Sequence, residues 1–289
     1  MPSTHSVWFL GTSAFAVPSL EALIADSAFS VDLVITQPDR PAGRKQELTA
    51  STVKIAAQKH GLKILQPENI NSFDLVTRNP QPEFLVVVSF GQILSQAILD
   101  IPTVAPVNVH ASLLPRWRGA SPIQHAILAV DKESGVTVQK IVKELDAGPI
   151  LAQENVMMDP RETYLTLHDK LAPMGAALLV RTLKAPLHPV EQDDAQLTIC
   201  RTLKREDGKL DHTSLTAVDI DRKVRALTPW PGVTLIINRQ FLKLLETSLE
   251  PGMDTAPLPC GNETILHLVT VQPAGGKAMT GAEWERGKR

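Results

Sequence analysis

The sequence is short of cysteine and of long apolar runs, and both shortages narrow the class of protein. Cys200 and Cys260 are the only cysteines in 289 residues, too few for a disulfide framework or a zinc site. The apolar run at residues 84–88 has the length of one strand, whereas a membrane-spanning helix needs roughly 18 residues. The first residues lack the basic start and long apolar core of a secretory signal. These absences predict a cytoplasmic protein.

The charge balance and one missing motif argue against two further classes. The 29 basic residues are nearly matched by 31 acidic ones, which excludes a chain coated in positive charge but allows local basic patches. Gly11 is followed by Thr12, Ser13 and Ala14, and no G-x-G-x-x-G run appears in the sequence. A nucleotide-dependent oxidoreductase is therefore a poor interpretation.

The first part of the chain has the pattern of an α/β fold. Short apolar runs alternate with longer amphipathic ones, which is typical of βαβ units and a mostly parallel sheet. We expect strands at residues 7–10, 31–36, 63–65, 84–90, 107–111, 135–142 and 151–157. We expect helices from the turn at residues 11–13 to about residue 26, at 51–60 and at 164–183, and a loop around Pro38 and Pro41.

The second part of the chain predicts a smaller β domain. The pattern breaks into polar and proline-containing sequence between about residues 184 and 211, and a helix is expected at 217–227. Beyond it, strand-length runs at 233–237, 241–245 and 264–271 predict a small, OB-like β-barrel or curled sheet. The predicted organisation is therefore an N-terminal domain at 1–185, a linker at 186–212 and a C-terminal domain at 213–289.

The densest group of chemically useful residues follows the strand at 107–111. Successive side chains of a strand alternate faces, so Asn108 and His110 project to the same side. Pro115 prevents the strand from continuing, and ligands bind outside the carboxyl ends of parallel strands. The alternative is that His110 is a hydrogen-bonded structural residue and Asn108 caps the strand end, and the spacing alone leaves both interpretations open.

Asp146 lies in a Gly/Pro-bounded loop after the strand expected at 135–142. If that strand is parallel to its neighbour, both end at one edge and the carboxylate can reach Asn108 and His110. An Asn, a His and an Asp together suit acyl transfer to an amine, as an oxyanion donor, a proton-transfer group and an orienting carboxylate. A single loop Asp is more often a turn former, so the spacing does not decide between the two.

Six segments resemble the 10-formyltetrahydrofolate-dependent formyltransferases, and in particular those that act on methionyl-tRNA. They are N-V-H-A-S-L-L-P-R-W-R-G-A-S-P-I-Q at 108–124, F-L-G-T-S-A-F-A at 9–16, T-Q-P-D-R-P-A-G-R at 36–44, L-D-A-G-P-I-L at 145–151, R-A-L-T-P-W-P-G at 225–232 and V-Q-P-A-G-G-K-A-M-T at 271–280. The first is shared by all formyltransferases of this kind, whereas the loop at 36–44 and the last segment are narrower signals. Together they cover nearly the whole chain.

The resemblance implies a Rossmann-like domain that binds 10-formyltetrahydrofolate and a C-terminal barrel that helps to hold initiator methionyl-tRNA. Asn108 would stabilise the oxyanion, His110 would transfer protons and Asp146 would orient the imidazole or a water molecule, without a metal. The implied folate-site residues are Phe90, Ile93, Leu94, Ser112, Leu113, Leu114 and Pro115, although core packing is an alternative for Ile93, Leu113 and Leu114. Arg44 and Lys45 would contact tRNA, and we expect a monomer that does not bind membranes.

Three departures from the family pattern, and two alternative functions, accompany this interpretation. Gln46 and Glu47 stand where basic residues are usual, Glu144 stands where Gly is common, and the region at 249–263 is short enough to lack a strand or a loop. One alternative is a formyltransferase for a small amine, such as a sugar nucleotide or glycinamide ribonucleotide. The other is a catalytically weak RNA- or folate-binding protein.

Overall fold

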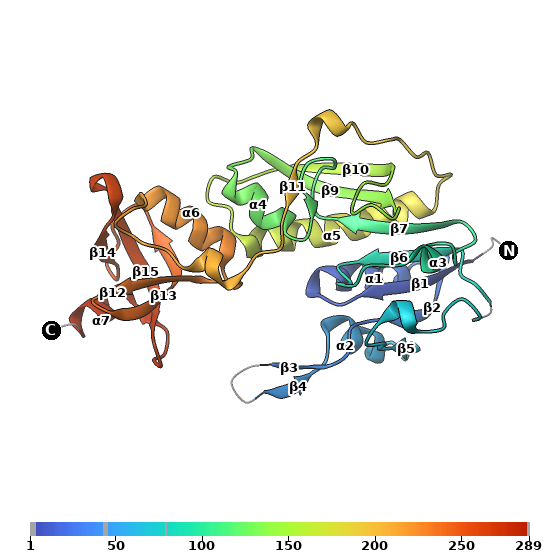
Figure 1. Cartoon of the computed structure of the whole chain (residues 1–289), viewed down its shortest axis with the longest axis horizontal. Coiled ribbons are helices and arrows are strands. Elements are labelled where there is room, and N and C mark those ends of the chain that lie inside the picture. The colour runs from blue at the N-terminus through green and yellow to red at the C-terminus, as the bar shows by residue number, and fades with distance from the viewer. Residues whose placement is uncertain (1–3, 43–45, 79, 288–289) are drawn as a thin grey trace. The chain divides into compact units, whose positions relative to one another are not determined.

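The computed structural model describes residues 4–42, 46–78 and 80–287, and the chain forms two compact units (Figure 1). Unit 1 combines Met1–Gly119, Glu133–Val156 and His168–Ile199. Unit 2 combines Ala120–Lys132, Met157–Leu167 and Cys200–Arg289. Within the described ranges, no helix is both long enough and apolar enough to cross a membrane.

Unit 1 contains a seven-stranded sheet in the order β10-β9-β7-β6-β1-β2-β5. The strands are β1 (His5–Gly11), β2 (Phe29–Ile35), β5 (Ile64–Leu65), β6 (Phe84–Val88), β7 (Ala105–His110), β9 (Glu133–Lys140) and β10 (Ile150–Met157). The pairs β1–β2, β1–β6, β6–β7 and β2–β5 are parallel, which confirms the predicted Rossmann-like, mostly parallel sheet.

The expectation that β9 is parallel to its neighbour is wrong. β9 pairs with β7 in antiparallel register, with His110 opposite Thr137 and Val107 opposite Lys140. Between these strands the chain forms α4 (Pro122–Leu128), which packs against α6 (Ala217–Leu227) within unit 2 and does not cover the sheet as a crossover helix. Because no helix returns the chain to the opposite edge, β9 starts at the edge where β7 ends.

The helices predicted for unit 1 are confirmed. They are α1 (Val17–Ala25), which follows the 3-10 turn η1 (Ala14–Ala16), α2 (Thr52–Lys59) and α5 (Tyr164–Leu183). The Ser51 side chain caps α2 by accepting a hydrogen bond from the Lys54 amide, as expected for Ser at an N-cap. The short helix α3 (Gln96–Leu99) and the 3-10 turn η2 (Ile70–Ser72) were not predicted, because a single turn leaves too little periodicity to detect.

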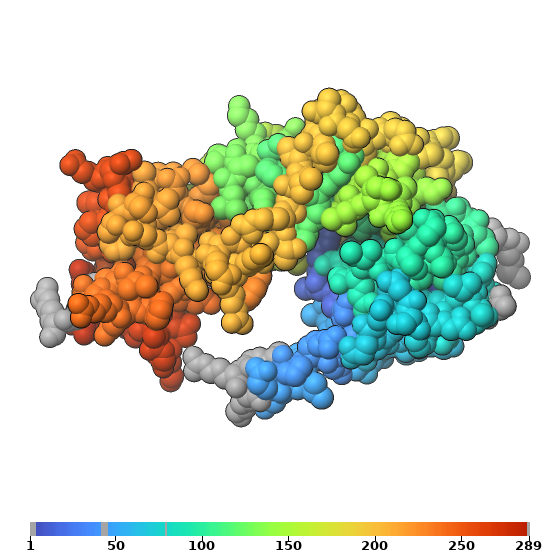
Figure 2. All heavy atoms as spheres, in the orientation of Figure 1, coloured from blue at the N-terminus to red at the C-terminus, as the bar shows by residue number. Residues whose placement is uncertain are grey.

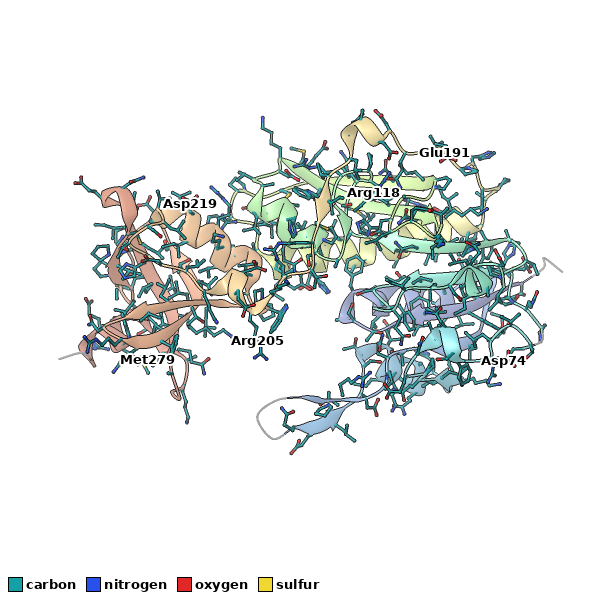
Figure 3. The ribbon with its side chains drawn as sticks, in the orientation of Figure 1. Asp74, Arg118, Glu191, Arg205, Asp219 and Met279 are labelled. Carbon is teal, nitrogen blue, oxygen red and sulfur yellow. The ribbon has the colours of Figure 1, made fainter. Side chains whose placement is uncertain are left out.

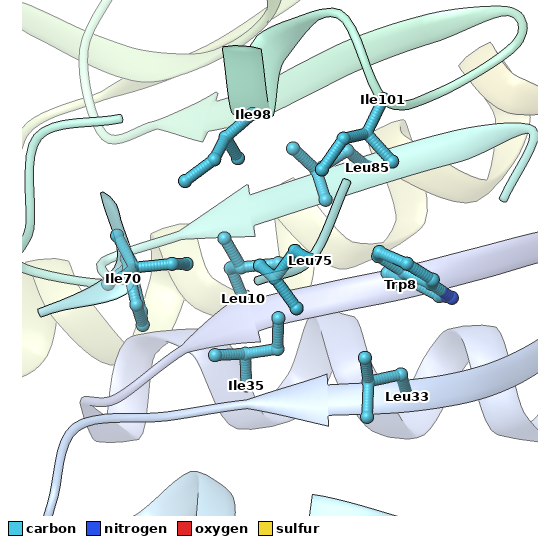
Figure 4. Packing of buried hydrophobic residues seen from close by; sticks show 10 residues of the cluster. Trp8, Leu10, Leu33, Ile35, Ile70, Leu75, Leu85, Ile98 and Ile101 are labelled. Atoms are coloured by element: carbon cyan, nitrogen blue, oxygen red, sulfur yellow. The ribbon is translucent and has the colours of Figure 1, made fainter. Parts of the chain in front are cut away.

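The sheet of unit 1 is buried on both faces, which explains why its central strands read as continuous apolar runs. Trp8 and Leu10 of β1 pack into one cluster, which Figure 4 shows with residues of β2, β6 and α3. Its buried members are Trp8, Leu10, Leu33, Ile35, Ile70, Leu75, Leu85, Phe90, Ile98 and Ile101. Phe9 faces the other side of the sheet and is fully buried there.

The segment after β2 forms a hairpin and not the loop that the sequence predicts. β3 (Arg40–Ala42) pairs with β4 (Glu47–Thr49) in antiparallel register, with Pro41 opposite Leu48. A two-stranded ribbon tolerates Pro41 because an edge position does not require its missing N–H. Arg44 and Lys45, the predicted tRNA contacts, lie outside the described residues.

Unit 2 contains a five-stranded sheet in which every recorded pair of strands is antiparallel. The strands run in the order β12 (Val233–Ile237), β13 (Gln240–Ser248), β15 (Ile265–Pro273) and β14 (Ala256–Pro259), with β16 (Met279–Thr280) also paired to β15. The strands predicted at 233–237, 241–245 and 264–271 are thus confirmed, and they pair in antiparallel register. β14 lies within the region at 249–263, so that stretch contributes a strand despite its shortness.

Three helices and a buried carboxylate complete unit 2. These helices are α4, α6 and α7 (Gly281–Arg286), and α6 has the bounds expected from the sequence. Asp221 of α6 is 1% exposed and accepts hydrogen bonds from both Arg161 and Arg225. Its Oδ1 also accepts from the Thr247 hydroxyl at 2.9 Å, which joins α6 to β13.

Short elements occupy the region between α5 and α6. The 3-10 turns η3 (Asp194–Gln196) and η4 (Arg205–Gly208) lie in the stretch expected to be a linker, and β8 (Arg118–Gly119) pairs with β11 (Ile199–Cys200). The division into domains at 1–185 and 213–289, joined by a linker at 186–212, stays a prediction.

Candidate active site

Asn108 and His110 lie on the same face of β7, as the alternation predicts. Gly175 of α5 packs closely against Val109, on the opposite face. His110 is 7% exposed, whereas Asn108 is half-buried. Among the described residues, none forms a hydrogen bond with the Asn108 side chain. An amide with accessible surface and no competing partner can donate to a substrate oxygen.

The His110 ring has a different neighbour at each nitrogen. Nε2 lies 2.9 Å from the carbonyl oxygen of Trp117, and Nδ1 lies 3.7 Å from Oδ1 of Asp146. A carbonyl oxygen only accepts, so Nε2 carries the proton and donates it. In the neutral ring Nδ1 is therefore the nitrogen that can take up a proton, and the Asp146 carboxylate stabilises the cation that results.

Asp146 is held by two donors and by the shape of its loop. Its Oδ2 accepts from the Gly119 amide at 2.9 Å and its Oδ1 accepts from the Gln139 side chain at 3.1 Å. The residue has φ of 51°, in the left-handed region where Asp is tolerated better than most residues. At Gly148 a Cβ atom would lie 1.7 Å from the Lys140 carbonyl oxygen, so only glycine lets the loop pack this close to β9.

The predicted meeting of Asp146 with His110 is therefore observed, but for a different reason. β9 is antiparallel, so its carboxyl end lies away from that of β7 and a shared edge does not bring the residues together. The loop after β9 instead folds back against its own strand. Glu144, the departure from the family pattern, accepts the Ala147 amide with its carbonyl oxygen at 3.3 Å, a turn that does not require glycine.

The segment after β7 orients the Trp117 carbonyl toward His110. The Ser112 hydroxyl donates to the Arg116 carbonyl at 2.6 Å, and Trp117 has φ of 61°. The Thr137 hydroxyl donates to the Ser112 carbonyl at 2.7 Å and accepts from the Leu114 amide at 3.1 Å. These hydrogen bonds fix the turn that holds the Trp117 carbonyl against Nε2 of His110.

The predicted folate-site residues differ widely in exposure. Ser112 and Leu114 are buried, and Leu113 and Pro115 are half-buried. Phe90 is buried in the cluster of Figure 4, and the half-buried Leu94 packs against it. Ile93 is 82% exposed. Core packing therefore accounts for Leu114, whereas it does not account for Ile93.

The basic residues of the hairpin segment that can be described are paired with acids. Arg40 donates to Glu68 at 2.9 Å, and Lys54 donates to Asp39 at 2.6 Å. The hydrogen bond from Lys54, followed by one from Gln66, lowers the pKa of Asp39 below its usual range. Two of the four cations between residues 39 and 54 are thus already balanced, which leaves Arg44 and Lys45 as the candidates for an anionic partner.

Two other features of the described residues bear on the site. None of their His, Cys, Asp and Glu side chains gathers in a group of three or more that could hold a metal ion.

A groove of about 580 Å³ lies between α1, α2 and α5 in unit 1, and it is lined by residues such as Val17, Ile55 and Ala172. None of the predicted site residues lines that groove.

Sequence reasoning missed Gln139, Gln192 and Arg118, which surround the Asp146 loop. Gln139 is 2% exposed and lies opposite Asn108 in the β7–β9 register. A glutamine directly after Val136 and Val138 in a predicted strand is a detectable signal, because a buried amide needs hydrogen-bond partners. Gln192 gives no such signal, since it lies in polar sequence.

The two parts of the chain have counterparts among known proteins. Residues 5–183 match the family described as formyl transferase, and residues 202–289 match the formyl transferase C-terminal domain. The chain therefore belongs to the formyltransferases. More particularly, it belongs to the family of the methionyl-tRNA formyltransferases, to which it is similar over nearly its whole length.

Three relatives illustrate this similarity. The chain is 40% identical to the methionyl-tRNA formyltransferase of Chloroflexus aggregans, over 96% of each chain. It is 42% identical to that of Bdellovibrio bacteriovorus, over 97% of this chain and 95% of the relative. It is 39% identical to that of Bacillus subtilis, over 96% of this chain and 93% of the relative.

Solved structures share the fold at lower sequence identity. HypX from Aquifex aeolicus in complex with tetrahydrofolic acid matches 97% of this chain with a TM-score of 0.66 and 12% identity. The chain spans about half of HypX, 46% of its length. An N-formyltransferase from Helicobacter canadensis, in complex with folinic acid and dTDP-3-aminofucose, matches 91% of this chain and 98% of its own, with a TM-score of 0.66 and 17% identity.

Proposed function

We propose that the chain transfers the formyl group of 10-formyltetrahydrofolate to the free amino group of initiator methionyl-tRNA, which gives N-formylmethionyl-tRNA for translation initiation. The observation that carries this proposal is the cluster of Asn108, His110 and Asp146 in a chain 37–42% identical to methionyl-tRNA formyltransferases over nearly its full length. A shared cluster alone would also fit other formyltransferases. The full-length similarity to enzymes of this one name favours methionyl-tRNA as the acceptor.

The proposed reaction forms one carbon–nitrogen bond and breaks another. The folate donor supplies an electrophilic formyl carbon, and its own nitrogen leaves with a proton. His110 takes up the proton that the attacking amine loses, at Nδ1, while Nε2 stays bonded to Trp117. Asn108 donates its amide to the oxygen on which negative charge develops, a contribution typically of about 10²–10³ in rate.

Asp146 acts on His110 through charge rather than through a direct hydrogen bond. At 3.7 Å the carboxylate is too far to accept a strong hydrogen bond, but it is close enough to attract the positive charge that the ring carries once it has taken up the amine proton. Both partners are nearly buried, at 8% and 12% side-chain exposure, so water screens the interaction weakly. In the proposed reaction the imidazole then passes this proton to the leaving nitrogen of the folate.

The donor fits beside this cluster if its rings contact the accessible apolar side chains. Ile93 exposes 82% of its surface, and Leu113, Pro115 and Leu94 are half-buried. Apolar and aromatic ligands bind to such surfaces because burial removes both partners from water. We assign the donor to these four residues, with Phe90, Ser112 and Leu114 supporting them from below the surface.

Methionyl-tRNA is an anionic macromolecule, and its proposed contacts are basic. We assign phosphate contacts to Arg44 and Lys45, supported by the pairing of neighbouring Arg40 and Lys54 with acids. Unit 2 is the proposed second contact surface. A monomeric state and a cytoplasmic location are further predictions, which gel filtration and cell fractionation would test.

The experiment mixes the protein with 10-formyltetrahydrofolate and methionyl-tRNA and measures formylated methionine after deacylation. We expect formylation that requires both substrates. Parallel reactions with an aminated sugar nucleotide and with glycinamide ribonucleotide test the small-amine alternative. Formylation of either small amine without formylation of methionyl-tRNA would overturn the proposal.

A further inference from the structure

A line of hydrogen-bonded side chains ends on the Asp146 carboxylate. Arg118 Nε donates to Gln192 Oε1 at 2.9 Å. Gln192 Nε2 lies 3.4 Å from Gln139 Oε1, and Gln139 Nε2 donates to Asp146 Oδ1 at 3.1 Å. All four residues belong to unit 1. Figure 3 labels Arg118, where the line begins, and Glu191, which precedes Gln192 in the chain.

The partners fix the direction of both glutamine amides. Arg118 can only donate, so the Gln192 oxygen must face it. The Gln192 nitrogen therefore points the other way, where it also meets the carbonyl oxygens of Asp146 at 2.8 Å and Gly148 at 2.7 Å. The two hydrogens of Gln192 Nε2 serve these two carbonyls, and the longer contact to Gln139 Oε1 shares one of them. With its oxygen toward Gln192, Gln139 presents its nitrogen to the carboxylate.

Gln192 and Gln139 restrain different parts of the same strained residue. Gln192 binds the loop backbone at two carbonyls, one on each side of Ala147, and Gln139 binds the side chain of Asp146. A left-handed residue other than glycine persists only where its surroundings hold it. Because Asp146 has φ of 51°, the two glutamines supply the restraint that its position requires.

Gln192 comes from a segment that the sequence predicts to be a linker. It lies between residues 183 and 202, the limits of the two family matches. This segment is nevertheless anchored to unit 1, because the backbones of Val190 and Ile150 exchange hydrogen bonds of 2.8 and 2.9 Å and Arg118 pairs with Asp194 at 2.7 Å. Figure 2 shows the segment, coloured yellow to gold, on the surface beside the green strands of unit 1.

We propose that Gln192, oriented by Arg118, is a positioning residue that sets the Asp146 carboxylate against His110, both directly through the loop backbone and through Gln139. The inference rests on the proposed role of Asp146 in formyl transfer. It deepens that role, because it makes Gln192, one residue of the segment at 184–199, part of the active site.

The test uses the full-length protein with Gln192→Glu, a variant of nearly the same shape that cannot donate to the loop carbonyls. The matched control is Gln196→Ala, four residues away, whose exposed amide donates to Asp193 at 3.0 Å and does not touch the loop. We expect Gln192→Glu to lower kcat roughly tenfold, a typical effect of removing a partner that orients a site residue, with little change in KM for methionyl-tRNA. Gln196→Ala should match the wild type in both constants.

A double variant separates positioning from a general structural role. In an Asp146→Asn background, the further change Gln192→Glu should cost much less than tenfold, because Gln192 acts through the residue already replaced. Full additivity of the two losses would overturn the inference. An unchanged kcat in Gln192→Glu alone would overturn it as well.

Hydrogen exchange provides a reading that does not depend on formylation. In Gln192→Ala, the amides of residues 141–148 should exchange faster than in the wild type and in Gln196→Ala. If the wild type formylates no methionyl-tRNA, the proposed function fails, while the exchange data still decide whether Gln192 holds the loop. Unchanged exchange across residues 141–148 would contradict the restraint itself.

Discussion

The Asp146 carboxylate faces the His110 imidazole at 3.7 Å while each of its oxygens accepts a hydrogen bond from a different group. Gly119 and Gln139 are those donors, at 2.9 and 3.1 Å. The position of the carboxylate is therefore fixed by these two hydrogen bonds and not by a hydrogen bond to His110. Such an arrangement places a carboxylate beside Nδ1, the ring nitrogen that can accept a proton when Nε2 donates to the Trp117 carbonyl.

The first prediction concerns the three residues proposed to be catalytic. Changing His110 to Ala, Asn108 to Ala or Asp146 to Asn should each lower kcat by at least about a hundredfold, because proton transfer and oxyanion stabilisation each contribute factors of this size. Steady-state kinetics with saturating folate donor would measure the loss. The exposed Asp193→Asn serves as the control and should retain normal turnover. Near-normal kcat in all three variants, with melting temperatures unchanged, would contradict the assigned site.

The second prediction concerns the segment around Arg44 that is proposed to contact tRNA. Replacing Arg44 with Ala should weaken methionyl-tRNA binding and leave binding of the folate donor unchanged. Introducing Lys at Gln46 and Glu47 should tighten tRNA binding and steepen its salt dependence, since the slope of log K against log salt grows with the number of phosphates neutralised. Titrations at several salt concentrations would measure both effects. An unchanged slope would show that positions 46 and 47 do not approach RNA.

The third prediction concerns the buried carboxylate of unit 2. Asp221→Ala leaves Arg161 and Arg225 without their shared acceptor, and Arg225 is 15% exposed. Breaking a buried ion pair of this kind typically costs about 3 kcal/mol in the free energy of unfolding. Urea unfolding would measure the loss, and Arg201→Ala, which removes an exposed pair with Asp207, should cost less than about 1 kcal/mol. Equal losses in the two variants would contradict the assignment of Asp221 as a buried anchor.

The fourth prediction concerns the dependence of stability on pH. The hydrogen bond from Arg201 lowers the pKa of Asp207 to about 2 from an ordinary value of 3.8. A lowered pKa in the folded state stabilises the fold above pH 3.8 and loses that contribution as the pH falls toward 2. Because Arg201 is 59% exposed, water screens the pair and the contribution is at most about 1 kcal/mol. The free energy of unfolding should therefore fall less between pH 5 and pH 2.5 in Arg201→Ala than in the wild type. An equal fall in both proteins would exclude this ion pair as a source of acid sensitivity.

The sequence predicted the elements whose apolar pattern is strong. The helix at 217–227 and the strands of the parallel sheet follow from periodicity, and Asn108 and His110 share a face because strand alternation requires it. The direction of β9 was not predictable, because it depends on α4 packing in unit 2 with α6, a contact between residues about a hundred positions apart. The hairpin at 40–49 was missed because its prolines and short strands resemble a loop.

The surroundings of the candidate site were harder to predict than its central residues. The three proposed catalytic residues lie in motifs with recognisable spacing, whereas Gln139 and Gln192 act by hydrogen bonds whose partners are distant in sequence. Ile93, for which the sequence left both a folate contact and core packing open, is 82% exposed, so its exposure was not predictable either. Burial of single residues in loops depends on how those loops fold, which periodicity does not describe.

The central claim is the transfer of a formyl group to methionyl-tRNA by the cluster around His110. The most direct measurement follows the label of [formyl-¹⁴C]-10-formyltetrahydrofolate into methionyl-tRNA with the wild type and with His110→Ala at equal concentration. The account predicts label on the methionine amino group with the wild type and at least about a hundredfold slower labelling with the variant. No label on methionyl-tRNA with the folded wild type, or equal labelling by both proteins, would contradict it.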